Sequence, residues 1–258
     1  MFSSKMKFLV AACLVSVVYG QIPIPSREVG YVYENGSDSA PVHLDVFIDL
    51  ICPDSKQALP TLLQVAEMYG PKQLQLTAHI FPLPYHRNSF YATKGAHAVA
   101  ALTKGNMTFD WFNLVYKNMP VLVNSATSQF SEDHMKDVFS SLAGSMGLVP
   151  ATFEPMLDDP NIEEDTRVAW KYACTRGVAA TPTFFVNDVT VGATPTWTAA
   201  QWKQLIDPIL NPSQKRLIFK SNRLSACAPN TKRCEYLPGK IECCTSGEAC
   251  IPNVGCRC

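Results

Sequence analysis

A cysteine at position 52 stands where a buried strand is expected to end and a helix to begin. The segment Cys52-Pro53-Asp54-Ser55 follows an apolar run over residues 42–51, and Pro53 suits a first helical position because no backbone N–H is needed there. A cysteine at a helix N-terminus faces unpaired N–H groups and the positive end of the dipole, which favour the thiolate. Because the thiolate is the form that attacks disulfides, the pattern predicts a reactive, exposed sulfur at Cys52.

Serine rather than a second cysteine occupies position 55. In a dithiol site the second thiolate attacks the mixed disulfide that the first one forms. The hydroxyl of Ser55 is not ionised at neutral pH and cannot take this role, although it is able to donate a hydrogen bond to a Cys52 thiolate. A full dithiol cycle therefore needs a thiol from outside this site.

The elements around Cys52 predict an α/β fold. The run of residues 42–51 reads as a strand covered on both faces, and the helix after Pro53 ends at Gly70. Leu74–Pro82 reads as a second strand parallel to the first, so both strands end at the same edge of the sheet. Cys52 and the loop carrying His86 then share that edge. His86 either approaches Cys52 or is simply a structural or solvated histidine.

Helical periodicity dominates residues 89–175, and a hairpin and a last helix follow. The expected helices are Ala92–Leu102, Phe109–Tyr116, Ser131–Met146 and Ile162–Thr175; the expected hairpin strands are Thr183–Val186 and Val189–Val191; the last helix is Thr198–Leu210, with Thr198 as its cap. Apolar stripes of this kind normally belong to a core rather than to a cofactor site.

Two motifs resemble the thioredoxin superfamily, most closely its DsbA-like branch. One is the Cys52–Ser55 segment with Pro60 in the following helix, and the other is Gly177–Asn187, which contains Thr181-Pro182-Thr183. The resemblance covers about residues 30–210. It implies a thioredoxin fold with a helical insertion over about 86–175, and a cis Pro182 facing the active cysteine. The site residues it suggests are Cys52, Ser55 and Pro182 for catalysis, and Thr181 for binding a peptide substrate. His86 is added as a substrate-binding residue because its loop shares the edge of the sheet with Cys52.

Composition places the chain among exported globular proteins. Of 258 residues, 47% are apolar and 17% charged. Residues 1–20 read as a secretory signal, in which Lys5 and Lys7 precede an apolar run too short to span a membrane. We expect a secreted or lumenal protein without a membrane span. The near-neutral charge argues against nucleic-acid binding, and the histidines show no paired metal spacing, so no metal or cofactor is assigned.

Seven cysteines crowd into the last 32 residues, which predicts a disulfide-rich module over 227–258 joined by a linker, 213–226, to a main domain over 21–212. The spacing resembles knottin-like miniproteins, whose topology implies the pairs Cys227–Cys244, Cys234–Cys250 and Cys243–Cys256, with Cys258 left over. Cys174 is either the partner of the leftover cysteine or a buried, reduced thiol. Asn35 and Asn106 lie in glycosylation sequons expected on exposed loops.

Three functions are compatible with these features. The first is monothiol exchange on protein thiols or disulfides, with glutathione or a second substrate thiol completing the reaction. The second is a non-catalytic thioredoxin-fold peptide binder or chaperone. The third is an interaction protein that acts through its cystine-rich tail.

Overall fold

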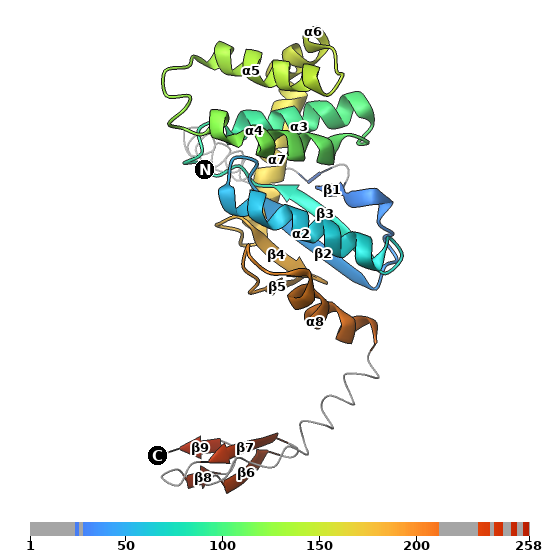
Figure 1. Cartoon of the computed structure of the whole chain (residues 1–258), viewed down its shortest axis with the longest axis vertical. Coiled ribbons are helices and arrows are strands. Elements are labelled where there is room, and N and C mark those ends of the chain that lie inside the picture. The colour runs from blue at the N-terminus through green and yellow to red at the C-terminus, as the bar shows by residue number, and fades with distance from the viewer. Residues whose placement is uncertain are drawn as a thin grey trace, which may run out of the picture. The chain divides into compact units, whose positions relative to one another are not determined.

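The computed structural model describes residues 24–25, 28–211, 232–237, 240–244, 249–251 and 255–257 (Figure 1). The chain divides into two compact units, one ending at Trp202 and the other beginning at Lys203, and each is described by itself. The expected signal sequence, 1–20, and the expected linker, 213–226, lie outside the described residues.

The first unit is built on a five-stranded sheet of order β1-β3-β2-β4-β5. Its strands are β1 (Tyr31–Val32), β2 (Val42–Ile48), β3 (Leu74–Ile80), β4 (Thr183–Val186) and β5 (Val189–Val191). β2 and β3 are parallel, as predicted, whereas β1 and β4 pair antiparallel to their neighbours. The β4–β5 hairpin turns at Asn187 and Asp188, both at positive φ, and this hairpin too was predicted.

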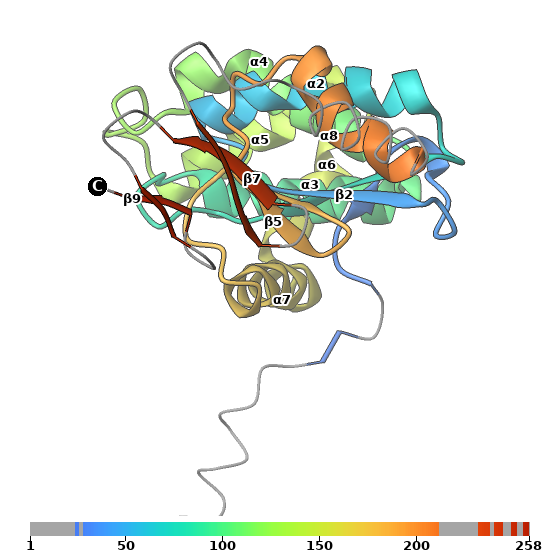
Figure 2. The ribbon, with the colours of Figure 1, turned by 90° about the horizontal axis from the view of Figure 1, so that it is seen from below.

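Helices α2 (Pro53–Tyr69) and α7 (Pro160–Thr175) cover opposite faces of this sheet (Figure 2). α2 buries Leu59, Leu62 and Val65 on its inner side and carries Pro60 in its interior. On the other face, Phe47 of β2 and Phe185 of β4 form an apolar cluster with Ala173, at the end of α7. Cys52 is thereby fixed between the end of β2 and the start of α2.

The prediction that the first strand is covered on both faces is wrong for its first half. Val42 and Leu44 are fully buried, but His43 and Asp45, which alternate with them, are only partly covered. The apolar cluster includes Phe47 but no earlier residue of β2, so the beginning of this strand keeps polar side chains on that face of the sheet.

The helical insertion between β3 and β4 is present as expected. It contains α3 (Ser89–Thr103), α4 (Thr108–Leu122), α5 (Glu132–Ser145), the short α6 (Pro150–Phe153), the 3₁₀ turn η2 (Glu154–Asp158) and α7. Trp111 of α4 is fully buried against α3 and donates its ring N–H to the Ala92 carbonyl at 3.0 Å. Gly95 permits this contact, because a Cβ at that position would overlap the Trp111 ring. α6 and η2 were not predicted, since such short elements carry too little periodicity.

The last helix, α8 (Ala199–Leu210), begins at the predicted cap. The Gln201 side chain accepts from the Thr198 backbone N–H at 2.9 Å, and the Thr198 hydroxyl accepts from the Gln201 N–H at 3.4 Å. Trp202 is buried edge-on against Phe184 of β4.

The second unit contains two small antiparallel sheets, β6 (Lys232–Leu237) with β7 (Lys240–Cys244) and β8 (Ala249–Ile251) with β9 (Gly255–Arg257). A disulfide joins Cys234 to Cys250, with 5.3 Å between their Cα atoms, which confirms one of the three expected pairs. Cys243 and Cys244 each take part in a disulfide as well. Cys227, from the expected pair Cys227–Cys244, and Cys258 lie outside the described residues, and the pair Cys243–Cys256 stays a prediction. Within the part of the chain that the structure describes, no helix is long and apolar enough to cross a bilayer.

Candidate functional site

Cys52 is the N-cap residue of α2. Its carbonyl accepts from the Lys56 N–H at 3.0 Å, its own N–H donates to the Asp49 carbonyl at 3.1 Å, and Pro53 takes the first helical position. The sulfur therefore stands at the N-terminus of a 17-residue helix, as predicted.

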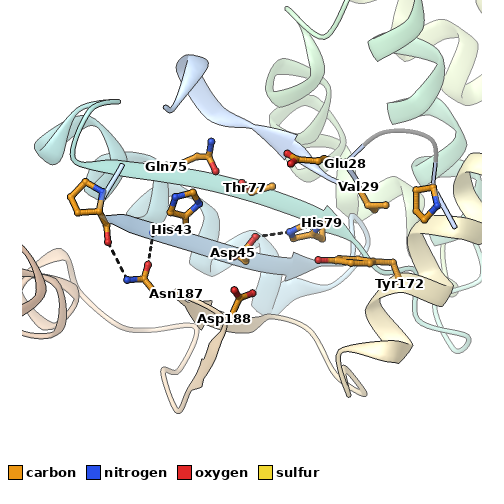
Figure 3. Close-up of a pocket in the computed structure, with 12 residues that line it drawn as sticks. Glu28, Val29, His43, Asp45, Gln75, Thr77, His79, Tyr172, Asn187 and Asp188 are labelled. Carbon is orange, nitrogen blue, oxygen red and sulfur yellow. Dashed lines mark hydrogen bonds and ion pairs between the residues drawn. The ribbon is translucent and has the colours of Figure 1, made fainter. Parts of the chain in front are cut away.

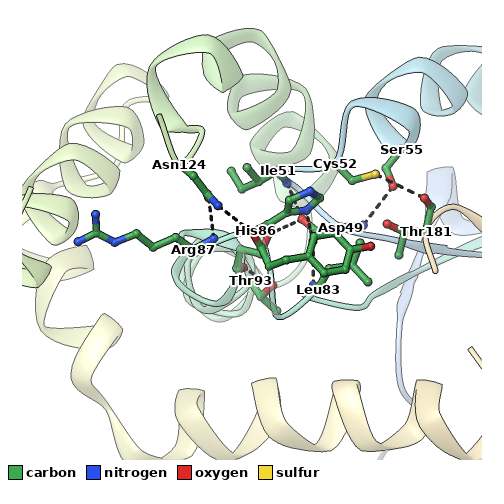
Figure 4. A network of polar contacts seen from close by, with 12 residues as sticks. Asp49, Ile51, Cys52, Ser55, Leu83, His86, Arg87, Thr93, Asn124 and Thr181 are labelled. Carbon is green, nitrogen blue, oxygen red and sulfur yellow. Dashed lines mark hydrogen bonds and ion pairs between the residues drawn. The ribbon is translucent and has the colours of Figure 1, made fainter. Parts of the chain in front are cut away.

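The peptide bond between Thr181 and Pro182 is cis and lies beside this cysteine, as the resemblance implied. The Cys52 thiol donates to the Thr181 carbonyl oxygen, with 3.4 Å between Sγ and the oxygen (Figure 4). The chain thus brings together two segments 129 residues apart, and both predicted motifs meet at one point.

Cys52 is nevertheless buried, with 5% of its surface exposed, and the expectation of an exposed sulfur is wrong. Leu50 and Ile51, which precede it, are buried as well. The helical insertion also reaches this edge, where the Tyr116 hydroxyl donates to the Asp49 carbonyl at 3.2 Å. Burial is the main cause that raises the pKa of Tyr116 well above its usual value, and the nearby charges of Asp49 and Cys52 add to it. This hydroxyl therefore stays protonated.

Ser55 is fully buried, and its hydroxyl oxygen accepts from the Asp49 backbone N–H at 3.2 Å. Its described partners are this N–H and the Tyr116 hydroxyl. The expected donation from Ser55 to Cys52 is not among the hydrogen bonds of the described residues. Ser55 instead helps fix the turn between β2 and α2.

Asp49 is the functional residue that sequence reasoning missed. Its side chain is fully buried and accepts four hydrogen bonds (Figure 4). The donors are the Ile51 N–H at 2.6 Å, the Leu83 N–H at 2.8 Å, His86 Nδ1 at 2.8 Å, and the Ser89 hydroxyl in a very short contact. One carboxylate thereby connects the Cys52 turn, the loop after β3 and the first turn of α3. The available clue was a single acidic residue within the apolar run of residues 46–51.

His86 lies at the same edge of the sheet as Cys52, as predicted. Its Nδ1 bonds Asp49, and 19% of its side chain remains exposed. A carboxylate only accepts hydrogen bonds, so Nδ1 must carry the hydrogen, and Nε2 is the acceptor nitrogen of the neutral ring. Tyr85 beside it is 61% exposed and contacts the His86 ring edge-on at 4.9 Å.

Cys174 is a free, exposed thiol near the end of α7. The expected disulfide to a tail cysteine is therefore wrong; the alternative is right that the thiol is reduced and wrong that it is buried. It follows Ala173, which does face the apolar cluster, and the helical rotation between adjacent residues turns its side chain away. Desolvation raises the pKa of the Cys174 thiol, which makes the thiolate scarcer at neutral pH.

The sequon residues Asn35 and Asn106 are both exposed, Asn106 in the connection between α3 and α4. Their exposure agrees with the expectation, and glycosylation itself stays a prediction. Among the described residues, no group of three or more His, Cys, Asp or Glu side chains is placed to hold a metal ion.

A thioredoxin family model matches residues 30–208, which is more than half of the chain. The chain belongs to the thioredoxin family. A comparison with curated proteins gives no match.

Solved structures of DsbA-like proteins share the fold at low identity. The thiol-disulfide exchange protein alpha-DsbA2 from Wolbachia pipientis is 18% identical with a TM-score of 0.54, covering 80% of this chain and 100% of that one. BdbD from Bacillus subtilis is 18% identical with a TM-score of 0.54, covering 70% and 92%. DsbA2 from Pseudomonas aeruginosa is 17% identical with a TM-score of 0.53, covering 73% and 98%. The expected DsbA-like thioredoxin fold is confirmed.

Proposed function

We propose that this protein performs monothiol thiol–disulfide exchange on protein substrates, with Cys52 as the nucleophile. The observation that carries the proposal is the free Cys52 sulfur at the N-terminus of α2, 3.4 Å from the Thr181 carbonyl oxygen. The serine at position 55 makes the proposed chemistry monothiol rather than dithiol.

In the proposed reaction the Cys52 thiolate attacks one sulfur of a substrate disulfide. The substrate S–S bond breaks, a mixed disulfide with Cys52 forms, and the second substrate sulfur leaves as a thiolate. A thiolate of the same substrate, or glutathione, then attacks the mixed disulfide and releases Cys52 as a thiolate. With a substrate thiol the net result is isomerisation; with two glutathione molecules the substrate disulfide is reduced and glutathione is oxidised.

His86 is the proposed proton acceptor for Cys52. Its Nδ1–H is tied to the buried Asp49, which leaves Nε2 as the acceptor nitrogen of the ring. An arriving substrate displaces the Cys52 thiol from the Thr181 carbonyl, and His86 takes the thiol proton. The backbone of Thr181, next to Pro182, is then available to an extended peptide, in agreement with the peptide-binding role suggested by the resemblance.

A Cys52→Ser variant tests the nucleophile. We expect it to lose the isomerisation of a scrambled disulfide protein in glutathione buffer, and to trap no mixed disulfide with a substrate protein. Cys174→Ser is the matched control, because it removes the other free thiol among the described residues and should retain full activity. Unchanged activity in Cys52→Ser would reject the proposal.

A His86→Gln variant tests the proton acceptor. We expect alkylation of Cys52 by iodoacetamide to slow by about 10-fold at neutral pH, since positioned acid–base groups contribute roughly 10²–10⁴-fold and the thiol ionises partly without help. At a pH where the thiol is already ionised, the two rates should converge. Equal rates throughout the pH range would assign His86 a purely structural role.

A non-catalytic peptide binder is the second candidate, and the burial of Cys52 favours it. It predicts that neither the natural chain nor Cys52→Ser performs thiol–disulfide exchange, and that both bind an unfolded substrate protein. The expected signal sequence makes export to the secretory lumen or outside the cell part of both proposals.

A chain without residues 213–258 tests whether the cystine-rich tail, rather than the thioredoxin unit, binds the partner.

A further inference from the structure

The sequon residue Asn35 lies in a tight turn that follows β1. Glu34 and Asn35 both have positive φ, 47° and 51°, as in a type I′ turn, and the Gly36 N–H donates to the Tyr33 carbonyl at 3.0 Å. Asparagine tolerates this left-handed conformation better than most residues do. Asn35 is exposed, and its side-chain amide makes no hydrogen bond among the described residues. The turn therefore presents the sequon amide at the surface.

A cavity of about 290 Å³ lies beside this turn. Glu34 lines it on one side of Asn35, and on the other side the Ser37 N–H donates at 2.8 Å to the carbonyl of Pro71, which also lines it. The cavity is open above Gly70, where an added Cβ would meet nothing within 4 Å. Its volume is near the lower end of the range of roughly 300–1,000 Å³ typical of small-molecule sites, which suits a single sugar ring.

The walls of this cavity combine apolar and hydrogen-bonding surface. The buried Leu74 and Ala66 are apolar, Tyr33 supplies an aromatic ring, and Glu34 and Glu67 supply carboxylates. A sugar ring matches both kinds of surface. Its C–H groups pack on the negative face of an aromatic ring, and its hydroxyl and amide groups donate to carboxylates.

The Tyr33 ring is fixed by two contacts. It packs edge-to-face with Phe109 of α4, with 5.0 Å between the ring centroids, and its hydroxyl donates to Glu67 Oε1 at 3.0 Å. Burial, followed by the hydrogen bond with Glu67 and its charge, raises the pKa of Tyr33 to about 12, so the hydroxyl remains a donor at neutral pH. A sugar that packs on this ring would therefore immobilise little that is free beforehand.

The cavity of about 870 Å³ on the sheet face opposite α2 lacks these features (Figure 3). Neither sequon asparagine lines it, and neither does a residue next to one of them in the chain. Several of its polar groups already bond one another: Asp45 bonds His79 at 2.7 Å, and Asn187 Nδ2 donates to the Pro41 carbonyl at 3.1 Å. The smaller cavity is thus the one that a sugar on Asn35 can reach.

We propose that Asn35 carries an N-linked glycan whose first N-acetylglucosamine packs in the smaller cavity against Tyr33 and stabilises the fold. The donor is a lipid-linked pyrophosphate oligosaccharide: Asn35 Nδ2 bonds to C1 of the sugar, the C1–O bond to the pyrophosphate breaks, and Nδ2 loses a proton. The proposal rests on the predicted export but not on thiol exchange at Cys52, so the two can fail separately. The three residues before Asn106 include no aromatic ring, so a glycan there should add bulk and solubility but little stability.

The test uses the full chain, secreted by eukaryotic cells that attach high-mannose glycans. Endoglycosidase H leaves the first N-acetylglucosamine on each occupied asparagine, and peptide mass mapping shows which sequons carry it. Tryptophan fluorescence follows thermal unfolding of the first unit, which contains all four tryptophans. We expect the sugar on Asn35, and a melting temperature of the trimmed chain within about 1 °C of the untrimmed one, because the first sugar makes the contact.

Point variants separate the sugar from the side chains around it. Ser37→Ala removes the glycan but leaves Asn35 in its turn, and should lower the melting temperature by about 3 °C, or roughly 1 kcal/mol for a domain of this size. Ser37→Thr keeps the sequon and should melt as the natural chain does. Ser39→Ala breaks the 2.9 Å contact between the Ser37 and Ser39 hydroxyls without changing the sequon, and with Asn106→Gln it should shift the melting temperature by less than about 1 °C. In a Tyr33→Leu background, Ser37→Ala should have no further effect.

The proposal is overturned if Asn35 carries no sugar, if the trimmed chain melts as Ser37→Ala does, or if Ser37→Ala and Asn106→Gln lower the melting temperature equally. If Tyr33→Leu does not fold, the comparison between Ser37→Ala and Ser39→Ala decides, and equal melting temperatures of these two variants would overturn it.

Discussion

The carboxylate of Asp49 has to satisfy four donors in a place that water does not reach. Two of these donors are backbone N–H groups, one is the ring of His86 and one is the Ser89 hydroxyl. Leaving one buried donor without its acceptor lowers the free energy of unfolding by about 1–3 kcal/mol. Asp49 therefore holds the Cys52 turn and the loop after β3 in one fixed arrangement, although it does not touch the sulfur.

An Asp49→Asn variant measures this effect. The amide keeps one acceptor oxygen and turns an NH₂ group toward donors, so we expect the free energy of unfolding in urea to fall by about 2–4 kcal/mol. Asp54→Asn, at an exposed residue in the first turn of α2, is the matched control and should cost less than about 1 kcal/mol. Equal losses in the two variants would mean that the Asp49 network is not what holds this edge.

The chemistry at Cys52 was predictable from the sequence because it depends on neighbours in the chain. A strand, a cysteine and a proline at a helix start are local features, and Thr181-Pro182 is a second local motif. The role of Asp49 was not predictable, since its partners Leu83, His86 and Ser89 lie 34–40 residues away. Tyr116 of the insertion, which donates to the Asp49 carbonyl at the same edge, is even more remote in the sequence.

At the level of elements, α3 and α7 are linked by a charged contact. Lys94 of α3 is nearly buried and bonds Glu163 of α7 at 2.6 Å and the Leu157 carbonyl at 2.9 Å; Arg167 bonds the other Glu163 oxygen at 2.6 Å. Desolvation of Glu163 acts to raise its pKa, but the hydrogen bonds from Lys94 and Arg167 outweigh it, and the pKa lies below the usual 4.5.

A Glu163→Gln variant should lower the free energy of unfolding at pH 7 by about 1 kcal/mol, because it leaves the Lys94 ammonium without its counter-charge. The folded pKa of Glu163 is the lower one, so its stabilisation is full above 4.5 and is lost as the pH falls through the folded value. Urea unfolding is measured at pH 7 and at several pH values below 4.5. The difference in the free energy of unfolding between the natural chain and the variant should decrease as the pH falls. Glu164→Gln, exposed on the same helix, should show no such trend.

The elements themselves followed from periodicity, with ends displaced by a few residues. α4, for instance, runs to Leu122 rather than ending at Tyr116, because Met119 and Leu122 continue its buried face. The misreading of β2 is instructive: His43 and Asp45 alternate with Val42 and Leu44, which is the pattern of a strand with one open face. The near-continuous apolar residues after Asp45 concealed it.

For the whole molecule, the family covers residues 30–208 and the cystine-rich tail lies beyond it. The cysteine count and the short length of the tail predicted that it depends on disulfides, and Cys234–Cys250 confirms one of them. The pairing of the other tail cysteines could not be derived, because six cysteines allow 15 connectivities and no apolar pattern discriminates among them. Cys174 was assigned by counting alone, and counting carries no information on where a side chain points.

The free state of Cys174 has a consequence for the full chain. The tail holds seven cysteines, an odd number, and Cys174 is not bonded to any of them. We expect alkylation of the denatured, unreduced protein to label Cys52 and Cys174, with Cys234 and Cys250 recovered in one cross-linked peptide pair. One further tail cysteine should either be labelled too or form a dimer that disappears on reduction in gel electrophoresis, because pairing within the tail cannot use all seven. Recovery of Cys174 in a cross-linked peptide would contradict this arrangement, and a label on Cys234 would contradict the disulfide that joins β6 to β8.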